Sequence, residues 1–344
     1  MEELKLYNSD FLLQYEKFYK FFDTINEDYD ILEVIPDYLK EDYIEQYESN
    51  LNSILEKDTK RYINLFKMQE KFLKSLQPSK IDGLAYLAIK EIEKNETITS
   101  ILNTFKPFKG FTNKIKYNRF GTVTGRLTVK AGPNILILPK RCRKILKSRW
   151  DSEGEVLSID FISLEPRLAR KLTSTDTGLD VYQDIMNSIS FEIDRSVIKK
   201  VIISVLYGSE RSFIEGFSRE RSQEVFNAVH EYFNIGEIKQ RYIKQDEFCI
   251  LRNFFGRPLW IDMDQRENVL VNNFIQSSAV DLSLKYFAQL TEKLDSEYFK
   301  PLYVIHDALV VDVKKEYKQK VEDLINLGYN DKELGNFPLN IEQV

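Results

Sequence analysis

Residues 156–171, with the sequence VLSIDFISLEPRLARK, change from a strand-like to a helix-like hydrophobic pattern. Val156, Leu157 and Ile159 form an apolar, partly β-branched run that predicts a buried strand, and the following residues predict a helix. Asp160 lies at the junction between the two. Because desolvating a lone carboxylate is costly, an aspartate in this position is expected to have a cation, an N-cap role or a metal.

A second apolar pattern predicts a β-hairpin with arms at 302–305 and 309–313 and with His306, Asp307 and Ala308 at the bend. Two strands of one sheet could bring Asp160 and Asp307 side by side, where their like charges repel unless a divalent metal bridges them. Two carboxylates together with phosphate oxygens form the site of a two-metal phosphoryl or nucleotidyl transferase, in which the ions lie about 3.5–4 Å apart.

Helical patterns fill the first part of the chain and recur near its centre. Residues 1–105 are expected to be mostly helical, with apolar residues at three and four spacing over 13–25, 43–76, 83–94 and 96–105. Arg195, Lys199, Ile203 and Tyr207 are spaced four apart, so on a helix they form one stripe. Two cations followed by a phenol on one face suit the binding of a triphosphate.

Composition limits the classes of protein that fit this chain of 344 residues. It is 43% hydrophobic and 30% charged, which is ordinary for a globular protein with two or three subdomains. Two cysteines and two histidines exclude a Cys-rich zinc site and disfavour a histidine-based one. No apolar run is long enough to span a bilayer, and the acidic start of the chain is unlike a targeting signal, so a cytoplasmic location is expected.

Charge is distributed unevenly along the chain. Residues 1–50 carry fourteen Asp/Glu and four Lys/Arg, whereas residues 106–149 carry thirteen Lys/Arg and no acid, with aromatic residues among them. The basic block predicts a polyanion-binding track. Gly121, Gly125 and Gly132 in it permit close approach of another chain. Its candidate phosphate-binding cations are Arg119, Arg126, Lys130, Lys140 and Arg141.

Several of these segments resemble motifs of family A DNA polymerases, the bacterial DNA polymerase I family. The stretch TGRLTVKAGPNILILPKR resembles the segment just upstream of the palm, SIDFISLEPRLA resembles motif A, and HDALV resembles motif C. Motif B, R-x3-K-x7-Y-G, matches Arg195, Lys199, Tyr207 and Gly208. ENVLVNNFIQSSAVDLSLKYF resembles the palm helix before motif C, and FPLNIEQV resembles the terminal strand. The resemblance covers about 117–344, with the motifs in the family's order.

The resemblance implies a role for each matched residue. The implied catalytic residues are Asp160, Asp307 and Lys199, and the implied metal site, for two Mg²⁺ ions that Mn²⁺ can replace, consists of Asp160, Asp307 and Phe161. The triphosphate would be bound by Arg195 and Lys199, with Tyr207 packed near the nascent base pair. Glu165 resembles the steric gate that excludes a ribose 2′-OH and is expected to be held by Tyr207. The implied contacts to DNA are Arg126, Asn134, Arg141, Asn272, Gln276 and His306.

The chain also departs from the family pattern. Ile203 replaces the usual Phe or Tyr, and Ala308 replaces the Glu that commonly follows the motif C aspartate. Asn268, Tyr182 and Ser163 stand where Arg, His and Gln are common. Two alternatives therefore stay open: a catalytically weak or partner-dependent nucleic-acid-binding or priming factor, and a single-subunit enzyme that synthesises RNA.

The resulting interpretation is an α+β right-hand fold that acts as a template-directed DNA polymerase. It predicts a helical thumb-like region at 1–109, palm at 110–172 and 263–344 with an antiparallel sheet, and helical fingers at 173–262. The expected partners are primer–template DNA, dNTPs and a separate exonuclease or processivity subunit. The acidic first 50 residues are expected to form a solvated helical face, with docking of such a subunit as the alternative. No intrinsic 3′–5′ exonuclease is expected, as in a compact phage-type enzyme.

Overall fold

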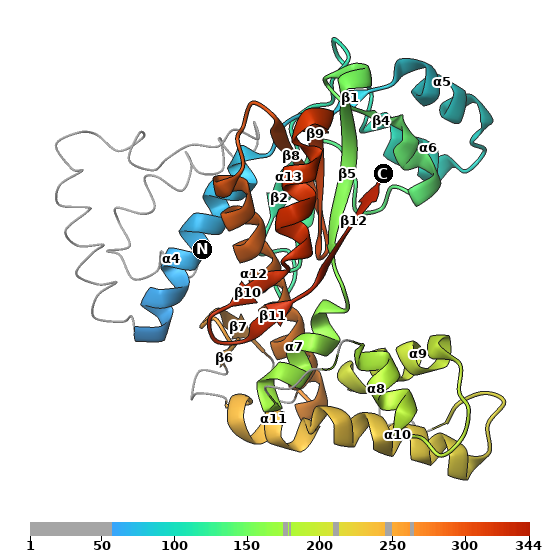
Figure 1. Ribbon diagram of the computed structural model, residues 1–344, viewed down its shortest axis with the longest axis vertical. Helices are drawn as coiled ribbons and strands as arrows, with labels where there is room; N and C mark the ends of the chain where they lie inside the picture. The colour runs from blue at the N-terminus through green and yellow to red at the C-terminus, as the bar shows by residue number, and fades with distance from the viewer. Residues whose placement is uncertain (1–56, 175–177, 179, 209–212, 245–249, 262–264) are drawn as a thin grey trace, which may run out of the picture. The chain divides into compact units, whose positions relative to one another are not determined.

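A computed structural model describes residues 57–174, 178, 180–208, 213–244, 250–261 and 265–344. The chain divides into two compact units, residues 1–60 and 61–344, and the second contains nearly all of the described part. The helix expected at 13–25 and the acidic segment 1–50 lie outside the described residues. The helices and strands of the second unit are labelled in Figure 1.

A four-stranded antiparallel sheet, in the order β12-β5-β9-β8, forms the centre of this unit. Its strands are β5 (Gly154–Phe161), β8 (Phe299–Ile305), β9 (Ala308–Lys314) and β12 (Leu339–Gln343). The predicted antiparallel sheet, hairpin and terminal strand are thereby confirmed. Ala308 was expected at the bend but is the first residue of β9, because His306 adopts a positive φ of 56° and a turn of His306 and Asp307 suffices to connect the strands.

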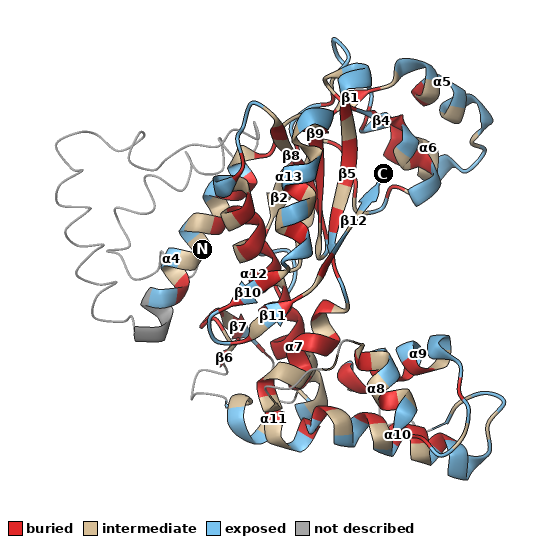
Figure 2. Cartoon of the chain, in the orientation of Figure 1, coloured by how far each residue is buried: buried red, intermediate tan, exposed pale blue. Residues whose placement is uncertain are grey.

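The sheet is covered by helices. Residues of β8 and β9 are buried along most of both strands, and α12 (Glu267–Lys293) is buried over most of its length (Figure 2). Phe161 of β5 packs edge-on against Tyr286 of α12, with ring centroids 5.4 Å apart. The helix α13 (Lys315–Asn326) packs on β5, β9 and β12. The strands β10 (Tyr329–Asp331) and β11 (Gly335–Phe337) form a small hairpin, of which β11 contacts α7.

Helices also account for most of residues 57–105, which precede the basic block. The helices expected at 83–94 and 96–105 are confirmed as α5 (Gly83–Ile92) and α6 (Glu96–Asn103). Of the helix expected at 43–76, the described part is confirmed as α4 (Lys57–Ser75), and residues 43–56 lie outside the described residues. The basic block after them is largely irregular. Its short elements are β2 (Lys116–Asn118), β3 (Thr128–Ala131), a 3₁₀ helix at Lys140–Ile145, and β4 (Leu146–Lys147), which pairs with β1 (Lys80–Ile81).

Beyond the end of β5, helices gather at one end of the sheet (Figure 1). They are α7 (Leu164–Thr173), α8 (Val181–Asn187), α9 (Arg195–Leu206), α10 (Arg219–Phe233) and α11 (Ile235–Tyr242). The segment 173–262 was expected to be helical but also contains an antiparallel hairpin of β6 (Ile250–Arg252) and β7 (Pro258–Trp260). Its turn includes Gly256 at φ +86°, a conformation that favours glycine.

A buried polar cluster joins four of these segments. The carboxylate of Asp281, on α12, is fully buried and accepts a hydrogen bond from Asn253 Nδ2 at 2.7 Å. The guanidinium groups of Arg119 and Arg257 each lie 3.6 Å from its other oxygen, and Arg119 also donates to Gln69 of α4. The cluster therefore ties α4, the basic block and the β6–β7 hairpin to α12.

The apolar centre of the sheet should dominate stability. Leu309 is fully buried on β9, opposite Ile159 of β5. We expect Leu309→Ala to lower the free energy of unfolding by about 2–5 kcal/mol, since it removes buried methyl groups and leaves a cavity. Urea denaturation followed by circular dichroism measures this change.

A matched substitution on the surface serves as the control. Leu87 is 62% exposed on α5, so Leu87→Ala should change the free energy of unfolding by no more than about 0.5 kcal/mol. Equal effects of the two substitutions would contradict the placement of the core.

Candidate active site

The two predicted aspartates lie next to each other at one end of the sheet. Asp160 is the penultimate residue of β5 and pairs in register with Ala308, directly after Asp307 in the turn. The Phe161 N–H points at the main-chain oxygen of Asp307, 3.5 Å away. Along β5 the side chains of Ile159 and Phe161 are buried, whereas that of Asp160 is exposed. The strand alternation therefore keeps a carboxylate at the surface between two core residues.

Their electrostatic surroundings favour a cation. Partial desolvation, together with the negative charges of Asp307 and Glu342, raises the pKa of Asp160 to about 6 although the side chain stays accessible to solvent. Desolvation also raises the pKa of Asp307, and the charge of Glu165 adds to the effect. Each shift reports chiefly the cost of desolvating a charged carboxylate, to which repulsion by nearby carboxylates adds. A divalent cation bound to both carboxylates would remove that cost.

These residues fit a Mg²⁺ site. Mg²⁺ prefers oxygen ligands and is commonly bound through one or two carboxylates together with substrate phosphates. Within the described ranges no group of three or more His, Cys, Asp and Glu side chains could form a complete protein cage. The Phe161 side chain is a buried phenyl ring, so only its main-chain carbonyl could serve as the predicted third ligand. The remaining ligands would then come from water and substrate oxygens.

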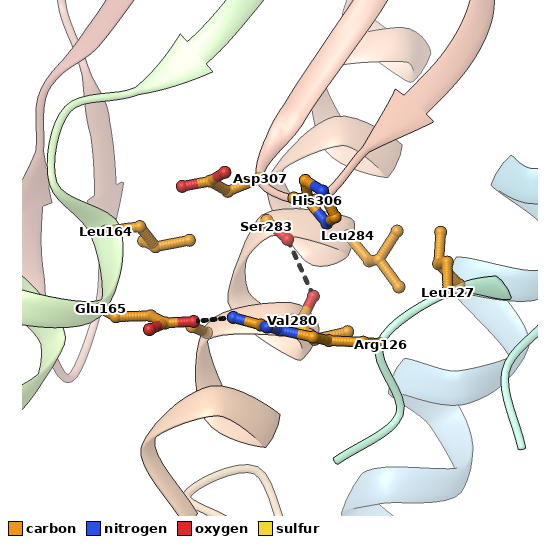
Figure 3. Close-up of a pocket in the computed structure, with 10 residues that line it drawn as sticks. Arg126, Leu127, Leu164, Glu165, Val280, Ser283, Leu284, His306 and Asp307 are labelled. Carbon is orange, nitrogen blue, oxygen red and sulfur yellow. Dashed lines mark hydrogen bonds and ion pairs between the residues drawn. The ribbon is translucent and has the colours of Figure 1, made fainter. Parts of the chain in front are cut away.

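A pocket beside Asp307 joins the sheet to α7, α12 and the basic block (Figure 3). Arg126 and Glu165 face each other across its floor, with Arg126 Nη2 donating to Glu165 Oε1 at 2.6 Å. Tyr207 completes the group: its hydroxyl accepts from Arg126 at 3.2 Å and donates to Glu165 Oε2 at 3.4 Å. The lining residues are Arg126, Leu127, Leu164, Glu165, Ala279, Val280, Ser283, Leu284, His306 and Asp307.

The contact between Glu165 and Tyr207 was predicted from the sequence and is present. The ion pair between Arg126 and Glu165 was not predicted, because the two residues lie in different segments whose approach depends on tertiary packing. Gly125 explains part of it: at φ +73° it packs directly on Arg257, where a Cβ would come within 1.7 Å of the guanidinium. The buried cluster around Asp281 thus fixes the main chain next to Arg126.

The predicted stripe on α9 is also present. Arg195, Lys199, Ile203 and Tyr207 are all exposed, while the opposite side of α9 supplies the buried residues Ile198, Val201, Ile202, Val205 and Leu206. Arg195 Nη1 donates to Asp180 Oδ2 at 2.6 Å, and the ring of Tyr182 lies against both cations. The sequence analysis did not single out Asp180, although an aspartate directly before a helix is a recognisable N-cap signal.

The predicted DNA contacts lie in varied surroundings. His306 is exposed at the pocket, and Arg141 is exposed but paired with Glu93 at 2.6 Å. Gln276 is buried, and Asn272 has a buried Oδ1 that lacks a hydrogen-bond partner. The main-chain N–H of Asn134 donates to Thr104 Oγ1 at 3.0 Å. A role of these five residues in binding DNA stays a prediction.

One expectation for the basic block is wrong. Arg119 was a candidate phosphate-binding cation, but its side chain is 2% exposed and belongs to the buried cluster around Asp281. Arg149, in the same block, pairs with the buried carboxylate of Asp312 at 3.2 Å. Part of the block's charge therefore balances buried acids elsewhere in the fold, which no local pattern in the sequence reveals.

The raised pKa of Asp160 predicts a stability effect with a defined sign in the metal-free protein. Asp160 binds its proton more tightly in the folded than in the unfolded protein. Its ionisation therefore lowers the free energy of unfolding progressively as the pH rises from about 4 through 6, and has no effect on it below that range. We expect Asp160→Asn to be more stable than wild type by about 1 kcal/mol near pH 7.5, after allowance for solvent screening, and equally stable near pH 3.5. Urea denaturation across this pH range, with a chelator present, measures the difference.

Substitution of a second aspartate, Asp151, should change stability in the opposite direction. Hydrogen bonds from Lys80 and Lys147 lower the pKa of Asp151, so Asp151→Asn should reduce stability at neutral pH and have no effect well below pH 4. If Asp160→Asn were instead less stable than wild type at neutral pH, the ionised carboxylate would be stabilised by its surroundings, which would contradict the prediction for Asp160.

Comparisons with known proteins show which family the chain resembles. DNA polymerase family A matches residues 36–342. The thermostable DNA polymerase I of Thermus thermophilus is 24% identical over 241 residues, which are 61% of this chain and 29% of that protein. The corresponding protein of Thermus aquaticus is 22% identical over the same shares. The matched stretch thus spans less than a third of each of these relatives.

A solved structure has a similar fold. It is the POL domain of Pol1 from M. smegmatis in complex with DNA primer-template and dNTP, with a TM-score of 0.57 and 17% sequence identity, covering 71% of this chain and 50% of that one. None of the described helices is both long and apolar enough to cross a membrane. Because the family match extends over most of the sequence, the chain belongs to DNA polymerase family A.

Proposed function

We propose that this chain is a template-directed DNA polymerase that adds dNTPs to a primer 3′-OH by two-metal nucleotidyl transfer. The observation that carries the proposal is the placement of Asp160 and Asp307 side by side, next to a pocket bounded by Arg126 and Glu165. Family membership supports it, as does the fold shared with a domain solved with primer-template DNA and dNTP.

Each part of the site has a task in this proposal. Asp160, Asp307 and the main-chain carbonyl of Phe161 would hold Mg²⁺, which when bound neutralises phosphate charge and favours the alkoxide form of the primer hydroxyl. Arg195 and Lys199, exposed on α9, bind the polyphosphate, and Lys199 would stabilise charge on the leaving pyrophosphate. Exposed basic residues, Arg141 among them, bind the DNA backbone.

The Arg126–Glu165–Tyr207 group would form the wall beside the sugar. The ion pair and the Tyr207 hydroxyl hold the Glu165 carboxylate at the pocket floor. A carboxylate fixed there leaves no room for a ribose 2′-OH, which gives a preference for dNTPs. Arg126, which faces the same pocket, is placed to contact the primer terminus once DNA enters.

The finer assignments are part of the proposal. We assign the thumb-like region to 1–109, palm to 110–172 and 263–344, and fingers to 173–262, with the β6–β7 hairpin of the last segment packed on α12 through Asn253. The absence of 3′–5′ exonuclease activity, the phage-type origin and a separate processivity partner stay predictions. Incubating a labelled primer–template with the protein and Mg²⁺ without dNTPs tests the first of these.

Primer extension is the decisive assay, and the aspartates are its test. We expect Asp160→Asn and Asp307→Asn each to lower the extension rate at least about a thousandfold, because each removes a ligand charge that the metal ions require. The measurement is single-nucleotide addition to a labelled primer under Mg²⁺. Since Asp160→Asn is expected to be more stable than wild type at neutral pH, unfolding would not explain its loss of activity.

Two results would contradict the proposal. Wild-type protein that binds primer–template tightly but does not extend it favours the binding or partner-dependent alternative, which the Ala308 departure suggests. Extension with rNTPs as efficient as with dNTPs favours the RNA-synthesising alternative, which the motif B sequence suggests.

Sugar discrimination should depend on Glu165. We expect Glu165→Ala to reduce the preference for dNTPs over rNTPs by about 10- to 100-fold, because it removes both the bulk and the charge that face the 2′ position. Parallel measurements of kcat/KM for dATP and ATP give the ratio. Glu316→Ala, on α13 outside the pocket, is the control and should leave the ratio unchanged. An unchanged ratio in Glu165→Ala would place the gate elsewhere.

A further inference from the structure

The N-terminus of α8 contains an aspartate whose two oxygens have separate partners. Asp180 Oδ1 accepts hydrogen bonds from the N–H groups of Tyr182 and Gln183, at 3.0 and 3.3 Å, and so caps α8. Asp180 Oδ2 accepts the 2.6 Å hydrogen bond from Arg195 Nη1. Oδ1 therefore has a structural role, while Oδ2 pairs with Arg195, a cation that the proposed function assigns to the triphosphate.

Tyr182, two residues after Asp180, places an aromatic ring against the same arginine. The Tyr182 ring centroid lies 4.6 Å from Arg195 Cζ and 5.2 Å from Lys199 Nζ. Both distances are within the range of a cation–π interaction. Tyr182 is partly buried and packs against the hydrophobic core, which fixes the ring, and α8 and α9 are neighbouring helices (Figure 1). A single ring therefore orders the two cations of the α9 stripe.

The Asp180–Arg195 pair is suited to exchange. The two side chains are 39% and 44% exposed, and ion pairs between such partly solvated groups are weak. Desolvation opposes ionisation of Asp180, but hydrogen bonds from Arg195 and from the main chain hold its pKa below the ordinary value, so the carboxylate is charged at neutral pH. A polyphosphate carries more charge than one carboxylate and can bind a guanidinium through two oxygens.

From this geometry, and resting on the proposed function, we propose that Asp180 and Tyr182 are positioning residues for the nucleoside triphosphate. Asp180 occupies Arg195 until the polyphosphate displaces it, and the Tyr182 ring keeps Arg195 and Lys199 aligned before and after the exchange. Tyr182, which departs from the family pattern, thereby gains a role that it exerts through the two cations. Because Asp180 competes for Arg195, it raises the concentration of polyphosphate that is needed to bind this side chain.

Substitution by asparagine separates the charge of Asp180 from its capping role. Asparagine caps helices as well as aspartate does, so Asp180→Asn keeps the hydrogen bonds to α8 and removes only the competing charge. We expect this variant to bind inorganic tripolyphosphate and dATP at least about threefold more tightly than wild type, as measured by isothermal titration calorimetry without DNA. Weaker or unchanged binding would overturn the role of Asp180.

A matched control tests whether any lost carboxylate has the same effect. Asp194 caps the neighbouring helix α9, where its side chain accepts a hydrogen bond from Ser196 N. Asp194→Asn therefore makes the same chemical change at the same kind of position. Its affinity for tripolyphosphate should stay within about twofold of wild type. If Asp194→Asn increased the affinity for tripolyphosphate as much as Asp180→Asn does, the change in net charge alone would explain the effect, and the proposal would be overturned.

The ring is tested by a pair of substitutions at Tyr182. Tyr182→Leu keeps an apolar side chain but removes the π face, so binding of both probes should weaken about two- to fivefold. Tyr182→Phe keeps the aromatic ring and should therefore keep most of the wild-type affinity. If Phe and Leu have the same effect, the hydroxyl or the packing matters instead of the ring, and the role of Tyr182 is overturned.

Steady-state primer extension separates this inference from the proposed function. Asp180→Asn should lower the KM for dNTP, and Tyr182→Leu should raise it, with kcat changed less than KM in both. Wild-type extension with unchanged KM and Kd values in the variants would overturn the positioning roles alone. Failure of the wild-type protein to extend any primer would overturn the proposed function, whatever the tripolyphosphate affinities.

Discussion

The site depends on the register of β5 against β9. In this register Asp160 lies opposite Ala308, so its carboxylate reaches the surface beside Asp307 while Ile159 and Phe161 point into the core. Because successive side chains of a strand point to opposite faces, a slip by one residue would bury Asp160 and expose its neighbours. On the other side of β5, β12 pairs Asn340 with Asp160 and adds a second constraint on the register. Core packing thus fixes where the two carboxylates meet.

A buried carboxylate fixes the other side of the pocket. Asp281 contacts Arg119 and Arg257 and accepts a hydrogen bond from Asn253, so groups from two distant segments, the basic block and the β6–β7 hairpin, converge on α12. A buried charge is tolerated only when it is paired and hydrogen-bonded, and removing one partner would leave the others uncompensated. Arg257 in turn leaves space only for a glycine at position 125, next to Arg126. The buried cluster therefore connects the stability of the fold to the position of Arg126.

Function and stability oppose each other at the surface of the site. Desolvation raises the cost of ionising both Asp160 and Asp307, and nearby carboxylates add to it, which weakens the metal-free protein at neutral pH. Cations in the same region are occupied in the absence of ligand: Arg126 by Glu165 and Arg195 by Asp180. In the proposed function, the polyphosphate would replace the contact of Arg195 with Asp180, whereas the pair of Arg126 and Glu165 would stay in place beside the sugar.

Local patterns were enough to predict the strand before Asp160, the hairpin around Asp307, the exposed stripe of α9 and the helices α4 to α6, because each follows from side-chain periodicity. The motifs also predicted the contact between Glu165 and Tyr207 and membership of the family. The sequence by itself therefore determined which local elements form and which residues on them are candidates for the chemistry. Only the tertiary structure decided the β6–β7 hairpin and which charges are neutralised inside the protein. Burial and ion pairing depend on segments far apart in the chain, so the basic block looks uniform in sequence even though Arg119 is buried against Asp281 and Arg141 is exposed.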